Sequence, residues 1–152
     1  MSDQLVPALE LPATTGKTLS TAERAGKKLV LYFYPKDATP GCTTEAQQFR
    51  DLHAQFAQAG CEIIGVSRDS LKSHENFKAK QELPFELASD AEEKACALFD
   101  VIKLKNMYGK QVRGIERSTF VIDANGAIRR EWRGVKVAGH AQEVLDFVKT
   151  LN

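Results

Sequence analysis

The chain has 152 residues, the length of one ordinary domain. Hydrophobic residues make up 43% and charged residues 27% of it, which excludes a disordered or membrane-embedded chain. The formal net charge of +1 gives no bulk field that would favour nucleic acid or an anionic membrane as a partner. The three cysteines are too few for a disulfide scaffold.

The first eleven residues contain neither a basic segment nor an apolar core, so no signal peptide is expected. The longest apolar run, residues 29–34, is too short to cross a bilayer. We therefore expect a cytoplasmic protein, in which thiols stay reduced unless they are catalytic. No repeat or flexible linker divides the chain, so residues 1–152 are expected to form a single domain.

The first half of the chain alternates strand and helix signals. Residues 5–21 mix short apolar patches with prolines and a glycine, which predicts a short edge hairpin. Residues 28–34 are β-branched and aromatic, so they predict a central strand buried on both faces that ends at Pro35. Thr39, followed by a proline, is typical of a helix N-cap, and apolar residues recur at helical spacing from there to Gly60.

The second half yields the remaining elements. They are a strand over 61–66, a helix over 71–81, a helix that begins at Asp90, a strand over 118–122, a turn over 123–126 into a strand over 127–132, and a helix over 138–151. This order predicts an α/β fold with a mixed central β-sheet flanked by helices. It is the pattern of a thioredoxin-like domain with an inserted helix.

Cys42 is the third residue of the helix predicted after the central strand. Unpaired backbone N–H groups and the positive end of the helix dipole meet there, and both favour a thiolate over a thiol. The alternative is a small apolar side chain packed under the helix, which this position at a helix start disfavours. The sequence therefore indicates a nucleophilic thiol.

The segment around Cys42 also resembles a known family. Residues 33–45 read Phe-Tyr-Pro-Lys-Asp-Ala-Thr-Pro-Gly-Cys-Thr-Thr-Glu, and Pro35, Thr39 and Cys42 match the peroxiredoxin signature Pro-x-x-x-Thr-x-x-Cys. The longer run resembles the peroxiredoxin Q subgroup, also called bacterioferritin comigratory protein. The likeness extends through residues 65–67, Asp69 and 117–123. It implies a thioredoxin-like fold and a thiol-dependent peroxidase that reduces hydrogen peroxide and organic hydroperoxides.

The resemblance also implies roles for individual residues. Cys42 would be the peroxidatic cysteine, whose thiolate attacks a peroxide oxygen and becomes a sulfenic acid. Thr39 would offer its hydroxyl to the thiolate and the peroxide, and Arg117 would stabilise the thiolate and the departing oxygen. Pro35 would shield the site from water, and the backbone N–H of Cys42 would help to hold the peroxide.

Three charged residues have alternative interpretations. Lys36 and Glu45 match the family motif, but a solvated loop or helix charge explains each equally well. Arg117, without the resemblance, has the alternative of a surface charge facing Glu116.

The sequence departs from many peroxiredoxin Q members in the thiol that resolves the sulfenic acid. Relatives carry that cysteine at the position of Gln47 or in the next helix, near residues 76–80, and this chain has none at either place. Cys61 heads a strand and Cys96 lies among apolar helix residues, so both are expected to be core residues. One-Cys chemistry with thioredoxin, glutaredoxin or glutathione as the external thiol is the leading hypothesis. A two-Cys mechanism with Cys96 or Cys61 as the resolving thiol is the alternative.

Other functions have less support. A thiol–disulfide oxidoreductase needs C-x-x-C, and the fourth position is Glu45. His53, His74 and His140 are scattered and no nucleotide motif occurs, so no metal and no cofactor are expected. A redox-sensing or chaperone-like module is the rival from another class, and turnover distinguishes it because a sensor reacts only once. No long exposed apolar segment demands a partner, so a monomer is expected.

Overall fold

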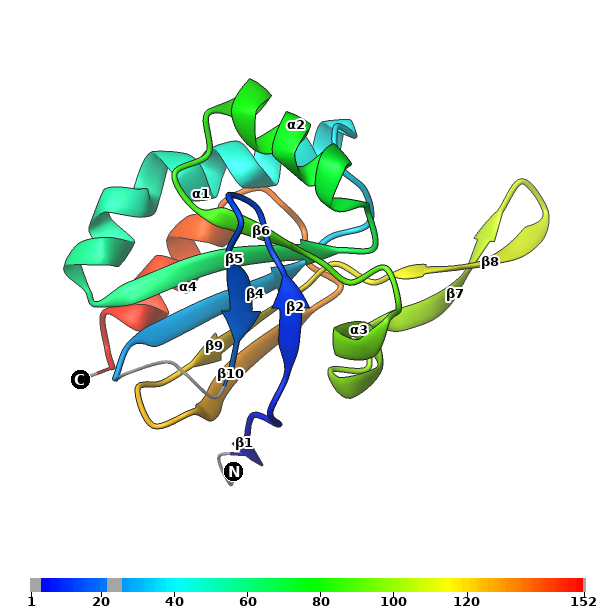
Figure 1. The fold of residues 1–152 in the computed structure, drawn as a ribbon. Helices are drawn as coiled ribbons and strands as arrows, with labels where there is room; N and C mark the ends of the chain where they lie inside the picture. Colours follow the sequence, from blue (N-terminus) through cyan, green and yellow to red (C-terminus); the bar gives the residue numbers. More distant parts are fainter. Residues whose placement is uncertain (1–3, 22–25, 152) are drawn as a thin grey trace.

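A mixed sheet of six strands forms the centre of the computed structural model, which describes residues 4–21 and 26–151 (Figure 1). The strand order is β1-β10-β9-β4-β5-β6. The parallel part consists of β4 (Lys28–Phe33), β5 (Cys61–Ser67) and β6 (Glu86–Ser89). The antiparallel part consists of β9 (Ser118–Ile122) beside β4, then β10 (Ala127–Arg133) and β1 (Gln4–Leu5). The predicted mixed α/β sheet is confirmed.

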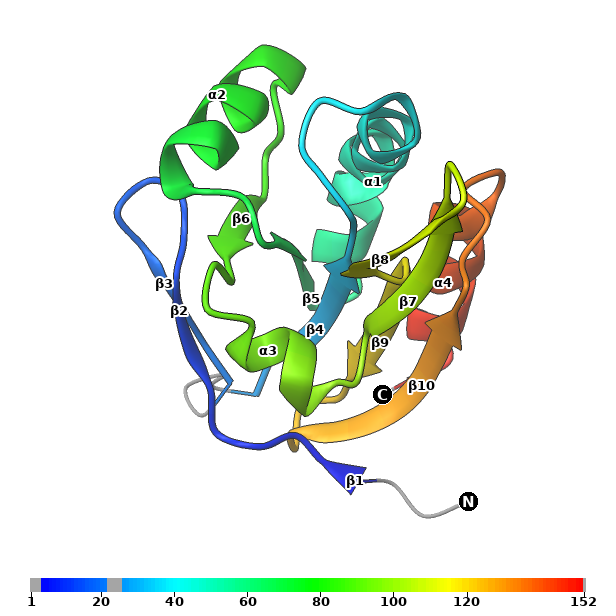
Figure 2. The ribbon, with the colours of Figure 1, turned by 90° about the vertical axis from the view of Figure 1, so that its right-hand side faces the viewer.

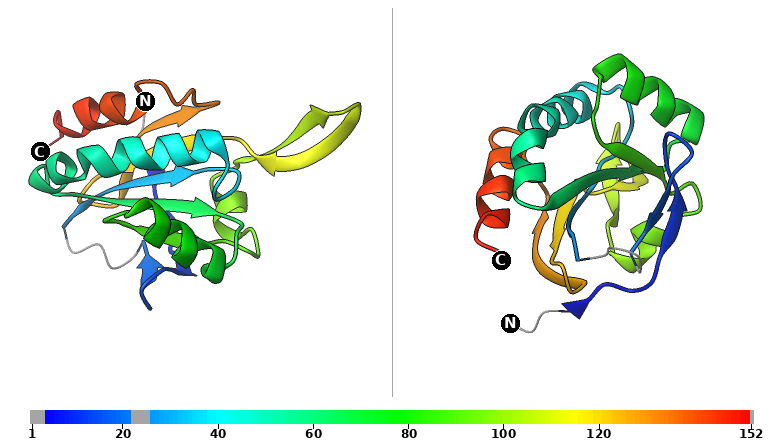
Figure 3. Two further views of the ribbon diagram at one scale, coloured as in Figure 1. Left: turned by 90° about the horizontal axis from the view of Figure 1, so that it is seen from above. Right: turned by 60° about the vertical axis from the view of Figure 1, so that its left-hand side comes forward.

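Helices cover the two faces of this sheet unequally (Figures 2 and 3). One face carries α1 (Pro40–Gln58), α2 (Leu71–Gln81) and α4 (His140–Val148). The other face carries the short α3 (Lys94–Leu98) and the hairpin of β2 (Glu10–Pro12) and β3 (Thr18–Ser20). None of the helices in the described part of the chain is long and apolar enough to cross a membrane.

The alternation of side chains along β4 divides the interior into two cores. Val30, Tyr32 and Tyr34 pack under α1, α2 and α4, whereas Leu29, Leu31 and Phe33 pack under α3 and the β2–β3 hairpin. All six side chains are buried. A central strand buried on both faces is therefore confirmed.

Strand β1, strand β6 and a further hairpin escape the sequence prediction. Strand β6 has only four residues, and the hairpin of β7 (Ile102–Met107) and β8 (Lys110–Ile115) projects away from the sheet (Figure 1). Leu104 and Val112 of this hairpin are exposed, so its described side chains show no alternation of buried and exposed residues. Its turn is formed by Tyr108 and Gly109, both with positive φ.

Helix α3 also begins later than predicted, at Lys94 instead of Asp90. The side chain of Asp90 accepts hydrogen bonds from the backbone N–H groups of Ala95 and Cys96, at 3.1 and 2.8 Å. Asp90 therefore satisfies two of the unpaired backbone N–H groups at the start of α3 from outside the helix.

Candidate active site

The first turn of α1 brings Cys42 to the end of β4. Thr39 is the N-cap residue, with an extended backbone at φ −83° and ψ 153°, and its carbonyl accepts a hydrogen bond from the Thr43 N–H at 2.8 Å. Pro40 fixes the first helical position, and Cys42 is the third. The local prediction for this turn is therefore confirmed.

The sulfur of Cys42 is buried and faces Arg117. Cys42 is only 2% exposed. Arg117 directly precedes β9, the neighbour of β4 in the sheet, and its Nη2 donates to Sγ of Cys42 at 3.4 Å. A guanidinium N–H at this distance stabilises a negatively charged sulfur more than a neutral thiol.

Glu45, one turn further along α1, binds the other arm of the same guanidinium. Nη1 of Arg117 donates to Oε1 of Glu45 at 2.7 Å, and Glu45 is 0% exposed. Burial raises the pKa of Glu45 to about 7, although the charge and the hydrogen bond of Arg117 act against this rise. The interpretation of Glu45 as a solvated helix charge is therefore wrong. Because the guanidinium is a rigid fork, Glu45 sets the direction in which Arg117 faces the sulfur.

Gly41 leaves room for this arginine. A Cβ atom at Gly41 would lie 3.2 Å from Nη2 of Arg117, closer than ordinary van der Waals contact. The position of the Arg117 side chain therefore explains why the residue before the cysteine is a glycine.

Three further residues of the motif lie in the segment between β4 and α1. The hydroxyl of Thr39 donates to the carbonyl of Lys36 at 2.8 Å. A hydroxyl has a single hydrogen to donate, so the expected hydrogen bond from Thr39 to the sulfur is not formed in this structure. Pro35 is half-buried, and Lys36 is exposed.

The other two cysteines lie away from Cys42. Cys61 pairs with Lys28 at the opposite end of the sheet, about 20 Å along the strands. Cys96 is fully buried in the core on the other face of the sheet. Burial and a hydrogen bond to Asp90 raise the pKa of the Cys96 thiol well above its usual value. Both are core residues, as predicted.

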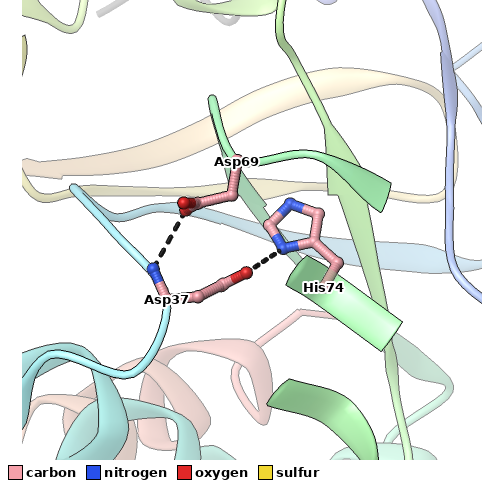
Figure 4. A group of neighbouring side chains, drawn as sticks. All are labelled: Asp37, Asp69 and His74. Atoms are coloured by element: carbon pink, nitrogen blue, oxygen red, sulfur yellow. Dashed lines mark hydrogen bonds and ion pairs between the residues drawn. The ribbon is translucent and has the colours of Figure 1, made fainter. Parts of the chain in front are cut away.

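Asp37, Asp69 and His74 form a further cluster beside the segment before α1 (Figure 4). One ligand atom from each residue lies within 4.8 Å of the others, the spacing that a metal ion would require. Hydrogen bonds explain the cluster without a metal, since Asp69 Oδ2 accepts from the Asp37 N–H at 2.9 Å and Asp37 Oδ2 lies 2.7 Å from His74 Nδ1.

Sequence reasoning missed this cluster because nothing along the chain links His74 to the motif. The available signal was that Asp37 and Asp69 both fall in segments that resemble peroxiredoxins.

A buried thiol at a helix start faces an arginine that directly precedes the neighbouring strand, on a mixed sheet of this order. This is the arrangement of a thiol peroxidase. The AhpC/TSA family profile matches residues 3–131. The chain belongs to the AhpC/TSA family.

Similar proteins assign the chain to one subgroup of this family. Peroxiredoxin Bcp of Xanthomonas campestris is 57% identical over 93% of this chain and 94% of its own, and Peroxiredoxin Bcp of Bacillus subtilis is 52% identical over 98% and 95%. A solved structure of Xanthomonas campestris peroxiredoxin Q matches with a TM-score of 0.89 and 56% identity, over 93% of this chain and 90% of that one. The chain is thus a peroxidase of the peroxiredoxin Q, or Bcp, subgroup, with the thioredoxin-like fold of that subgroup.

Proposed function

We propose that Cys42 is the peroxidatic nucleophile. Its thiolate attacks one oxygen of a peroxide ROOH, the O–O bond breaks, and the sulfur becomes a sulfenic acid, Cys-SOH. The RO⁻ group leaves and takes up a proton, which gives water or an alcohol. The observation that carries this proposal is the 3.4 Å contact between Arg117 Nη2 and Sγ of a buried cysteine at a helix N-terminus.

Arg117 stabilises negative charge in both states of the reaction. The charge lies on the sulfur before the attack and on the departing oxygen after it, and a guanidinium held by Glu45 reaches both. Thr39 turns its hydroxyl from the Lys36 carbonyl to the peroxide when the substrate binds. Pro35 keeps water from the sulfur, and the Cys42 N–H donates to the bound peroxide.

The sulfenic acid is then resolved by an external thiol RSH. The thiol attacks Sγ to give a mixed disulfide and water, and a second RSH releases the Cys42 thiol and RSSR. Support comes from the positions of the other thiols, because a disulfide requires Cα atoms within about 7 Å of each other. Cys61 lies at the far end of the sheet and Cys96 lies in the other core. The two-Cys alternative therefore requires that part of the fold opens.

Hydrogen peroxide and organic hydroperoxides are the proposed substrates, with thioredoxin, glutaredoxin or glutathione as the reductant. A solved Xanthomonas campestris structure concerns the alkyl peroxide reduction activity of the bacterioferritin comigratory protein of that organism. The proposed state is a monomer, with Arg117 and Glu45 of the same chain supplying the contacts around Cys42. Chemistry that begins from a reduced sulfur favours the cytoplasm.

The resolving step is tested by treating the protein with one equivalent of hydrogen peroxide, without reductant, and then analysing non-reduced peptides by mass spectrometry. We expect Cys42 as a sulfenic acid trapped by dimedone, and a mixed disulfide when glutathione is added. A dominant Cys42–Cys96 or Cys42–Cys61 linkage would contradict the one-Cys mechanism.

Single cysteine variants test the nucleophile. Cys42→Ser should abolish multiple-turnover peroxide reduction with a thiol donor, because a hydroxyl is not ionised at neutral pH. Cys61→Ser and Cys96→Ser are the matched controls and should keep most of the activity of the folded protein. Consumption of only one equivalent of peroxide by the wild type would instead favour a redox sensor.

A further inference from the structure

Asp37, in the segment that leads to Cys42, forms a buried pair with His74 of α2 (Figure 4). Asp37 is 6% exposed and His74 is 0% exposed. Oδ2 of Asp37 lies 2.7 Å from His74 Nδ1 and also accepts from the Ser73 hydroxyl at 2.8 Å. Oδ1 accepts from the Tyr34 hydroxyl at 2.6 Å. Both carboxylate oxygens therefore face donors.

The partners of His74 determine its charge. Nε2 lies 3.0 Å from the carbonyl of Ala88, which only accepts, so Nε2 carries a hydrogen. Nδ1 lies 2.7 Å from Oδ2 of Asp37 and 3.4 Å from the Tyr34 hydroxyl, which gives its single hydrogen to Asp37. An ionised Asp37 only accepts, so Nδ1 donates as well. A ring that donates from both nitrogens is an imidazolium.

The pKa of Asp37 agrees with a charged pair. Burial raises the pKa of Asp37, but the hydrogen bonds from His74, Tyr34 and Ser73 and the charge of His74 outweigh burial and hold this pKa below its usual value. Asp37 is therefore ionised at neutral pH, opposite the imidazolium.

The pair joins three parts of the fold. Asp37 lies in the segment before α1, His74 in the first turns of α2, and the carbonyl of Ala88 in β6. The backbone N–H of Asp37 donates to the carboxylate of Asp69, which follows β5, at 2.9 Å. The segment before α1 is thus anchored by both its backbone and its side chain, two residues ahead of the helix cap.

We propose that Asp37 and His74 are positioning residues for Cys42, an inference that rests on the proposed function of that cysteine. Neither of them hydrogen-bonds the sulfur in the described structure. They hold a segment in which Ala38 has a left-handed φ of 63°, a strained conformation for a residue with a Cβ atom. Holding that conformation fixes where α1 begins, and so fixes Sγ opposite Arg117.

The consequence of losing the pair is a displaced sulfur. A shift of about 1 Å in a reacting atom can lower a rate by about 100-fold. The variants Asp37→Asn, which removes the charge at nearly constant shape, and His74→Gln, which removes the cation, should each slow the formation of Cys42 sulfenic acid at least tenfold.

The experiment measures this rate by quenched flow with dimedone trapping, at a temperature where circular dichroism shows each variant to be folded. The double variant should be no more than about twofold slower than the slower single variant, because residues that act as a unit are not additive. The matched controls are Asp51→Asn and His53→Gln, an exposed and a half-buried residue of α1 away from the pair, and both should keep the wild-type rate.

A spectroscopic measurement separates positioning from mere stability. The ¹⁵N shifts of His74 at neutral pH should show two protonated ring nitrogens in the wild type and an unprotonated Nδ1 in Asp37→Asn. A neutral ring in the wild type overturns the charged pair, and a folded Asp37→Asn protein within twofold of the wild-type rate overturns the positioning role.

Should Asp37→Asn fail to fold, Tyr34→Phe tests the same point. It removes one donor to Asp37 and keeps both charges. A loss of about threefold is expected, and an unchanged rate counts against the proposal. Absence of Cys42 sulfenic acid in the wild type would instead overturn the proposed function.

Discussion

Arg117 is the residue on which the site converges. Its two terminal nitrogens divide between Sγ of Cys42 and the carboxylate of Glu45, so one planar group contacts both the reacting atom and its own support. Glu45 supports the arginine with only one of its two oxygens. Its other oxygen, Oε2, is buried and has no hydrogen-bond partner among the described residues. A buried carboxylate with one oxygen unpartnered costs free energy. Here the buried carboxylate of Glu45 orients Arg117.

This geometry predicts that charge alone does not replace the arginine. Arg117→Lys keeps the positive charge but offers a single ammonium group, which cannot contact Sγ and Glu45 in the same way. The rate of Cys42 oxidation should fall by at least tenfold, measured in a single turnover with hydrogen peroxide. Arg113→Lys, on the projecting β7–β8 hairpin, is the control and should match the wild type.

At the scale of elements, the first turn of α1 shows why a glycine precedes the cysteine. Alanine favours a helix over glycine by up to about 1 kcal/mol, so Gly41→Ala should leave the free energy of unfolding unchanged or higher. Its Cβ atom, however, would lie 3.2 Å from Nη2 of Arg117 and push the guanidinium from the sulfur. The peroxide reaction should therefore slow by several-fold. Urea unfolding and a single-turnover assay on the same sample measure both effects, and a variant that changes neither would contradict this account.

The elements also show which parts of the fold the sequence predicts. Helix α1 was predictable because Thr39, the proline after it and Gly60 are local signals, and β4 because its apolar run needs burial on both faces. The β7–β8 hairpin was not predictable, because Leu104 and Val112 are exposed and its described side chains show no alternating pattern. In the site, the motif pointed to Cys42 and Arg117, whose contact the structure contains. The burial of Glu45 and the pairing of Asp37 with His74 depend on which elements meet in space, which no local signal reports.

At the scale of the whole molecule, two buried groups give opposite dependences of stability on pH. Burial lowers the pKa of His140 to about 4, so the unfolded chain takes up a proton first and stability falls as the pH drops from about 6.5 to 4. Burial raises the pKa of Glu45 from 4.5 to about 7, so the folded protein holds a proton that the unfolded chain has lost, and stability falls as the pH rises over that interval. Between about pH 4.5 and 6.5 the two contributions oppose each other.

Substituting either group should leave the pH dependence of stability that the other group causes. In Glu45→Gln, the free energy of unfolding should decline by at most about 3 kcal/mol as the pH falls from about 6.5 to 4.5, where His140 is protonated in the unfolded chain but not in the folded one. In His140→Gln, it should decline toward neutral pH by a similar amount, the contribution of Glu45 alone. Urea unfolding at several pH values measures both slopes. Curves for the two variants that run parallel to the wild type would show that these groups do not titrate in this way.

The separation of the two cores has a practical consequence for studying motion in this protein. Cys61 belongs to the layer under α1 and α4, and Cys96 to the layer under α3, so each layer contains its own buried thiol. In a Cys42→Ser background, pulsed alkylation modifies each thiol only when its layer opens to solvent. Equal modification rates would mean that the two layers open together as one cooperative unit. Unequal rates would identify which side of the sheet opens first.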